Sequence, residues 1–185
     1  MGKTVAGYSA MAKFYHWVMA ILVLIMVPMG LIMTDLSGGA LQNTLYFYHK
    51  SIGILLFFLV ALRLFQHWVT PAPKVPASLP VHLRIISRVL HGLIYLVLIV
   101  NPILGWIGLS LYGAPMPFFG LFNLPSVVAQ DKPNAESILD FHATIGVVFA
   151  WLITLHILAG LYHWLIAKDG IIERMTTAPY QRPPD

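Results

Sequence analysis

The feature that most constrains this chain is a set of four long apolar segments, each long enough to cross a lipid bilayer as a helix. About 20 helical residues span the roughly 30 Å hydrocarbon core of a membrane. Segments of this length run over about 14–34, 45–65, 88–111 and 139–166. The chain is 58% hydrophobic and 10% charged, whereas soluble domains carry about 25% charged residues. The sequence therefore predicts an all-α membrane protein, a four-helix transmembrane bundle that forms a single domain over residues 1–185.

The connections between the predicted helices differ in character. The first, over residues 35–42, is short and rich in glycine and serine. The second, HWVTPAPKVPASLPVH over residues 67–82, is rich in proline and is expected to be an extended linker. The third, over residues 112–137, contains GAPMPFFGLFNLP, which is too apolar for a simple linker and is expected to fold back over the bundle. Inside the third helix, Pro102 predicts a kink.

Basic residues are distributed unevenly between the two sides of the predicted bundle. Four spans place both termini and the second connection on one side, and lysine and arginine accumulate on the cytoplasmic side of membrane proteins. The side with the termini carries Lys3, Lys13, Arg63, Lys74, Arg84, Arg88, Lys168, Arg174 and Arg182, and the other side carries Lys50 and Lys132. We therefore expect both termini in the cytoplasm. The first apolar run is long enough to span, and no small-residue cleavage site follows a short apolar core, so we expect no cleaved signal.

Histidines form a pattern within these apolar segments. His142 and His156 are 14 residues apart, which is close to four helical turns, about 21 Å along the axis, with directions within about 40° of each other. His49 lies near the outer end of its helix, at the depth of His142. His16, near the cytoplasmic end of the first helix, could pair with His156 at a second depth. Simple depth counting places His16 nearer His163, so His163 remains a rival for that pair.

Paired imidazoles inside a membrane bundle restrict the chemistry of the site. Two neutral imidazoles that face each other can hold an iron porphyrin, whereas zinc or copper sites usually need a third or fourth ligand close by. The chain has no cysteine, which excludes covalently attached haem and cysteine-bound iron–sulfur clusters. Gly53 and Gly146, beside the outer pair, and Gly160, beside His156, would leave room for a porphyrin. An iron with two histidine ligands passes single electrons, so the pattern predicts two non-covalent b-type haems.

Several stretches together carry a resemblance to a known family. They are YHWVMAILV in the first predicted helix, YHKSIGILL and ALRLF in the second, RVLHGLIYLVLIVNPILGW in the third, and FHATIGVVFAWLITLH with LYHWLIAKDGIIERM in the fourth and the tail. In this order and with this histidine spacing, the chain resembles the bacterial cytochrome b561 family over nearly its full length. These are small four-helix, di-haem cytochromes of the bacterial inner membrane, so the resemblance implies a multi-pass protein of that membrane.

The resemblance also implies which residues bind the cofactors. Carried over to this sequence, the axial ligands are His16 and His156 for the inner haem iron, and His49 and His142 for the outer haem iron. This choice favours His156 over His163.

Quinone, with ubiquinone as the candidate, is the implied electron partner at one membrane face. His91 and His163 lie near the cytoplasmic edge and are candidates to contact a quinone carbonyl or a haem propionate. Arg63, Arg84 and Arg88 could also pair with propionates, because arginine suits carboxylates, or could serve as positive-inside anchors.

Several functions remain open at this point. The first is electron transfer across or within the membrane, between the quinone pool and an unknown periplasmic donor or acceptor. Two further haem functions are a superoxide oxidase, which would be a quinone-linked oxidoreductase enzyme, and a cytochrome b anchor subunit of a dehydrogenase or hydrogenase. The last is a non-haem transporter of protons or metal ions, disfavoured by the lack of buried carboxylates. The lipid bilayer is an expected partner and nucleic acid is not.

Overall fold

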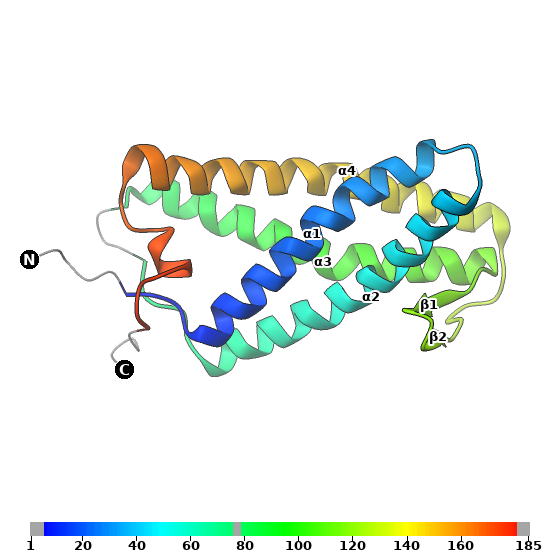
Figure 1. Cartoon of the computed structure of the whole chain (residues 1–185), viewed down its shortest axis with the longest axis horizontal. Coiled ribbons are helices and arrows are strands. Elements are labelled where there is room, and N and C mark those ends of the chain that lie inside the picture. The colour runs from blue at the N-terminus through cyan, green and yellow to red at the C-terminus, as the bar shows by residue number, and fades with distance from the viewer. Residues whose placement is uncertain (1–5, 76–78, 181–185) are drawn as a thin grey trace, which may run out of the picture.

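Four long helices account for most of the chain in the computed structural model, which describes residues 6–75 and 79–180 (Figure 1). Helix α1 spans Ala10–Asp35, α2 spans Ala40–Val69, α3 spans Val81–Tyr112 and α4 spans Lys132–Tyr162. All four are long and apolar enough to cross a membrane. The prediction of a helical membrane protein with four spans is therefore confirmed, and each helix starts before the apolar segment that predicted it.

Local sequence explains where these helices begin and end. The side chain of Ser9 accepts a hydrogen bond from the Ala12 N–H at the start of α1, and Asp131 accepts one from the Asn134 N–H at the start of α4. Such caps satisfy N–H groups that have no partner within the helix. At the end of α3, Gly113 has a φ of 78°, a left-handed conformation that glycine adopts without steric cost.

Helix α3 changes direction about midway along its length (Figure 1). Pro102 lies inside this helix, and proline has no N–H to donate to the carbonyl of Leu98, four residues earlier. Pro102 lies beyond the middle of the helix, so the kink expected near it stays a prediction.

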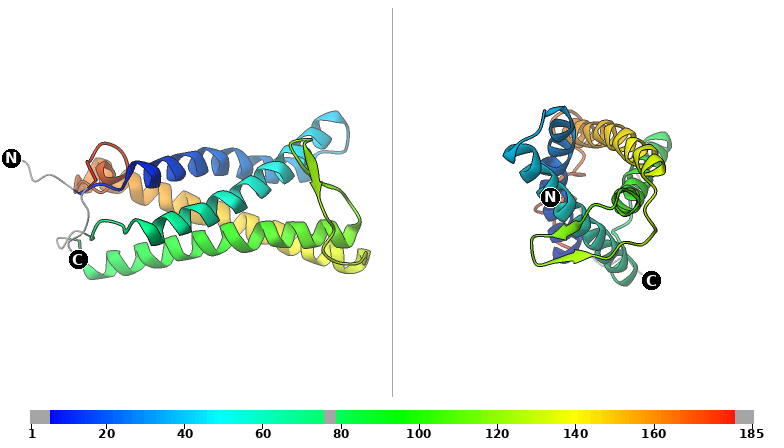
Figure 2. Two further views of the ribbon diagram at one scale, coloured as in Figure 1. Left: turned by 90° about the horizontal axis from the view of Figure 1, so that it is seen from below. Right: turned by 90° about the vertical axis from the view of Figure 1, so that its right-hand side faces the viewer.

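The apolar third connection folds back onto the bundle as a small β-hairpin. Strand β1, Met116–Phe118, pairs antiparallel with β2, Phe122–Leu124. Ser51 on α2 is fully buried beneath it; its Oγ accepts from the Phe119 N–H at 2.9 Å and donates to the Pro117 carbonyl at 3.1 Å. Figure 2 shows the hairpin at the end of the bundle opposite the start of α1, and we call this the hairpin end.

The opposite end, called the terminal end here, is formed by residues 6–9, the connection after α2 and residues 163–180. After α4 the chain makes a π-helical turn, η1 (His163–Ala167), and a 3-10 turn, η2 (Glu173–Met175). Arg174, which is 5% exposed, donates hydrogen bonds to carbonyls of Ala6, Pro73 and Lys74. It thus ties the tail to both the N-terminal segment and the second connection. Residues 76–78 of that proline-rich connection lie outside the described residues.

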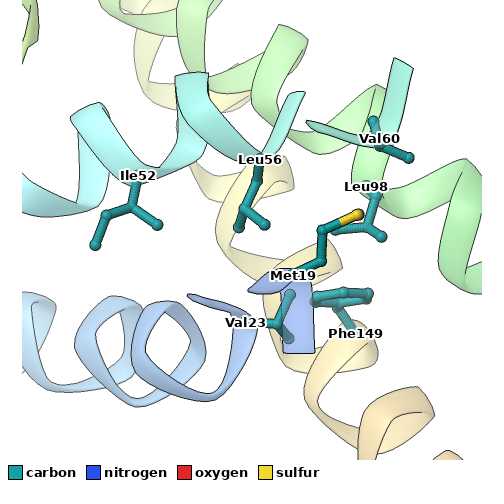
Figure 3. Close-up of a cluster of buried hydrophobic side chains, with 7 residues drawn as sticks. All are labelled: Met19, Val23, Ile52, Leu56, Val60, Leu98 and Phe149. Atoms are coloured by element: carbon teal, nitrogen blue, oxygen red, sulfur yellow. The ribbon is translucent and has the colours of Figure 1, made fainter. Parts of the chain in front are cut away.

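A compact apolar cluster occupies the middle of the bundle (Figure 3). It consists of Met19 and Val23 from α1, Ile52, Leu56 and Val60 from α2, Leu98 from α3 and Phe149 from α4. Phe149 lies halfway along α4 between His142 and His156. The core therefore separates the two levels at which histidines were predicted to pair.

Large apolar side chains also cover the outside of the helices. Leu24, Phe58, Leu96 and Trp151, one from each helix, are all about half exposed or more. An outward apolar surface of this extent would be unstable in water, and it is what a helix presents to lipid.

Candidate functional site

Helix α4 supplies one histidine to each of two pairs. At the hairpin end, the ring centres of His49 and His142 lie 6.0 Å apart with an interplanar angle of 82°. At the terminal end, the ring centres of His16 and His156 lie 6.2 Å apart with an angle of 54°. The structure therefore brings together the same two pairs that the sequence pointed to, and we call them the outer pair and the inner pair.

The separation within each pair suits two ligands on opposite sides of one metal ion. An imidazole nitrogen binds a metal at about 2.0–2.1 Å, and the ring centre lies about 1 Å behind that nitrogen, so two such rings have centres about 6 Å apart. Both pairs match this spacing, and their inclined planes show that the rings are not stacked on each other. A haem iron with two histidine ligands fits both places.

Several imidazole nitrogens at these sites are buried without a hydrogen-bond partner in the described part of the chain. They are Nδ1 of His16 and both Nδ1 and Nε2 of His49. Buried polar atoms are nearly always hydrogen-bonded, so these nitrogens are suited to bind a group other than the protein. By contrast, Nδ1 of His142 donates to the Asn101 carbonyl at 2.9 Å, which orients its ring and leaves Nε2 available to bind a metal.

Glycines on neighbouring helices make room for the outer rings. A Cβ atom on Gly30 of α1 would lie 2.9 Å from Cε1 of His49, and one on Gly105 of α3 would lie 3.2 Å from Cε1 of His142. Sequence reasoning missed both glycines, because the sequence around a helical glycine does not indicate which side chain of another helix packs against it. These two positions must stay small for the outer histidines to hold their places.

The glycines that were expected to make room for a porphyrin behave differently from one another. A Cβ on Gly53 would meet the side chain of Met26 at 3.1 Å, and one on Gly160 would meet Ile172 at 3.4 Å. These two glycines therefore serve helix and tail packing, which corrects that expectation. Around Gly146, no atom lies within 4 Å of a Cβ, so this glycine does face open space.

The inner pair has polar neighbours that the outer pair lacks. The His91 ring lies 5.0 Å from the His156 ring, and its Nδ1 donates to the Ser87 carbonyl at 2.6 Å. Arg63 on α2 is also buried, and it donates to the carbonyl of Ala12, one turn before His16. Its burial was not evident from the sequence, because a basic residue near a helix end resembles an interfacial anchor.

His163, the rival for the inner pair, is engaged elsewhere. Its Nδ1 donates to Oδ2 of Asp169 at 2.6 Å. A cavity of about 230 Å³ adjoins this pair and is lined by residues that include Leu83, Tyr162 and Ile171. The structure therefore places His163 at a separate concave site at the terminal end.

The two remaining histidines lie outside both pairs. His82 is exposed. The His67 ring lies 6.4 Å from the Tyr8 ring in a stacked arrangement, and its Nδ1 is buried. Within the described residues, no group of three or more His, Cys, Asp or Glu side chains is arranged to hold a metal ion.

Comparisons with known proteins identify the family of the chain. The family profile for prokaryotic cytochrome b561 matches residues 7–178. The chain is 31% identical to "Cytochrome b561 homolog 2" of Escherichia coli (strain K12), over 94% of this chain and 93% of that protein. It is 30% identical to "Probable superoxide oxidase CybB" of Yersinia pestis, over 91% of this chain and 94% of that protein. The chain therefore belongs to the prokaryotic cytochrome b561 family, and it is a b-type cytochrome of a bacterial membrane that takes part in electron transfer.

Proposed function

We propose that this protein carries electrons between a donor or acceptor at the hairpin end and quinone at the terminal end, through two non-covalent b-type haems. The outer haem would be held by His49 and His142, and the inner haem by His16 and His156. The haems would supply one-electron chemistry, because an iron with two protein ligands has no free position for oxygen. The observation that carries the proposal is the pair of histidine couples, each with ring centres about 6 Å apart, at two levels of one helix.

The direction across the membrane follows from the charge distribution. In the described chain the terminal end carries Lys13, Arg63, Lys74, Arg84, Arg88, Lys168 and Arg174, whereas the hairpin end carries Lys50 and Lys132. Because basic residues accumulate in the cytoplasm, the terminal end faces the cytoplasm and the hairpin end faces the periplasm of a bacterial inner membrane. The donor or acceptor at the hairpin end would therefore be periplasmic.

The cavity beside His163 is the best place for a quinone head group. Asp169 fixes the orientation of the His163 ring through Nδ1, which leaves Nε2 free to hydrogen-bond a quinone carbonyl and to exchange a proton with it. The apolar residues around the cavity suit a hydrophobic ring. His91, which contacts His156, is better placed to meet the edge of the inner haem than a quinone.

The first test is a visible spectrum and a haem assay of the purified protein. We expect the sharp bands of reduced bis-histidine haem and two haems per chain. A chain without haem bands would contradict the proposal and favour the transporter, and a single haem per chain would contradict the two-site arrangement.

The identity of the external donor requires a kinetic test. Superoxide is a second candidate, because a similar protein is described as a probable superoxide oxidase and because Lys50, next to His49, could attract an anion. Two superoxide ions would each give one electron, leaving two O₂, and the quinone would take up two electrons and two protons to form quinol. Stopped-flow reduction of the haems by superoxide, quinol and ascorbate separates the cases: fast reduction by superoxide supports the oxidase, and reduction by quinol alone supports a relay to another acceptor.

A further inference from the structure

Arg63 is a buried cation in a membrane bundle. Its residue is 7% exposed, and it lies on α2 one turn beyond Val60, a fully buried member of the core. Arginine is almost never buried to this extent unless it is paired, because an unpaired charge in an apolar interior has a high desolvation cost.

The protein partners of this guanidinium are neutral. Nε donates to the Tyr95 hydroxyl at 2.8 Å and Nη1 donates to the Ala12 carbonyl at 2.7 Å. Within residues 6–75 and 79–180, Arg63 forms no ion pair with a carboxylate, unlike His163, which pairs with Asp169. A guanidinium has five N–H donors, so the side chain can form further hydrogen bonds with an anion.

The location of Arg63 connects it to the inner pair. Ala12 precedes His16 by one helical turn on α1, and Tyr95 follows His91 by one turn on α3. The His91 ring in turn contacts the His156 ring. At the outer pair the nearby cation is Lys50, which is partly exposed and bonded to the Pro115 carbonyl.

We infer that Arg63 binds a carboxylate of the cofactor held by the inner pair, that is, a propionate of the inner haem. The inference rests on the proposed function, since it requires a haem at His16 and His156. The fork of a guanidinium matches a carboxylate in shape and charge. A lipid phosphate has the same charge, but the low exposure of Arg63 favours a partner inside the bundle.

The test compares natural haem with haem dimethyl ester, which has the same ring and no free carboxylate. Apoprotein of the His142→Ala variant, in which only the inner site can bind haem, is titrated with each form. Arg63→Gln is the test change, and Lys74→Gln, which alters an exposed lysine at the same end, is the control. We expect Arg63→Gln to weaken the binding of natural haem at least tenfold, which corresponds to about 1.4 kcal/mol. The binding of the ester should not weaken.

Each outcome decides the inference. If the binding of both haem forms weakens equally, the inference is overturned, because Arg63 would then only support the fold. If the binding of neither form weakens, the inference is overturned in favour of another anion, such as a lipid phosphate. If Arg63→Gln does not fold, Arg63→Lys keeps the charge but loses the fork, and we expect it to weaken natural haem more than the ester. If unaltered protein binds no haem at all, the proposed function fails instead, which is a different result.

A redox titration gives a readout that a purely structural role would not change. Reduction of the iron adds an electron, so a nearby positive charge favours the reduced form. We expect Arg63→Gln to lower the ratio of reduced to oxidised inner haem at a fixed potential about tenfold, equal to 59 mV for one electron. The outer haem, measured in the two-haem protein, should keep its potential, and an equal shift of both haems would contradict the inference.

Discussion

The hairpin end and the terminal end of the bundle each present a pair of histidines, in different surroundings. Both have two imidazoles about 6 Å apart. At the hairpin end the rings lie against glycines, and a backbone carbonyl orients His142. At the terminal end a buried guanidinium and a third imidazole lie beside the pair.

If each pair holds a haem as proposed, this difference would give two similar irons different properties. The surroundings of a ligated metal tune its potential through charge, hydrogen bonds and burial. Close packing against glycines distinguishes the outer site, and a buried charge distinguishes the inner site. Substitutions that change side-chain volume should therefore affect the outer site, and substitutions that change charge should affect the inner site.

The largest expected effect is the loss of a ligand, which tests whether the two ends are separate sites. We expect His142→Ala to remove the outer haem and keep the inner one, and His156→Ala to do the reverse. In each variant the haem-to-chain ratio, measured from the absorbance of extracted haem, should fall from two to one. The control His82→Ala, which alters an exposed histidine, should keep both haems. If His163→Ala loses a haem while His156→Ala keeps both, the inner assignment is wrong.

Arg174→Ala should have the next largest effect, because it removes the hydrogen bonds that tie the tail to two other segments at the terminal end. The change deletes a buried guanidinium that donates to three carbonyls from two other segments, at a cost of about 3 kcal/mol of stability. The midpoint of thermal unfolding in detergent should fall, and limited proteolysis should cut the tail near residues 168–180 sooner. Arg88→Ala, at an exposed site, is the control. Equal stability of the two variants would contradict the role of Arg174 in holding the terminal end together.

Gly30→Ala tests whether shape controls the outer site. The new Cβ would lie 2.9 Å from His49 Cε1, and crowding of this kind costs about 2 kcal/mol. We expect weaker binding of the outer haem and an unchanged inner haem, measured by haem titration of the variant. Gly92→Ala, where no atom lies within 4 Å of the new Cβ, should leave the outer haem in place. Equal effects on both haems would show that the glycine serves the general fold.

The smallest expected effect is that of Ser51→Ala, which detaches the hairpin. The change removes the acceptor for the part-buried Phe119 N–H, at a cost of about 1 kcal/mol. Hydrogen–deuterium exchange should become faster at residues 116–124 and stay constant at the terminal end. Thr44→Ala, whose exposed hydroxyl bonds only within α2, is the control. Unchanged exchange at Phe119 would mean that other contacts hold the hairpin.

Much of the fold could be predicted from the sequence, because the bilayer imposes a simple rule on apolar length. Four apolar runs gave four helices, and 14 residues between His142 and His156 gave two levels on one helix. Depth counting placed His16 nearer His163, because it treats the helices as parallel. In the structure α1 crosses α4 obliquely (Figure 1), and the ring of His16 meets that of His156.

The features that were missed depend on contacts between distant segments. The roles of Gly30 and Gly105 depend on which ring of another helix faces them. Arg63 and Arg174 resemble other basic residues near helix ends, and their burial follows from α1, α3 and the N-terminal segment closing over them. Local sequence carries no signal for such contacts.

The sharing of α4 between both pairs has a consequence for assembly. Helix α4 packs extensively along α3 but touches α1 little, and only Ala135 and Phe149 of this 31-residue helix are buried by protein. A haem that joined α4 to α1 or to α2 would fix the position and rotation of the whole helix. The first haem to insert would thereby align the histidine for the second, so the protein should fill cooperatively, and singly loaded molecules should be scarce during maturation.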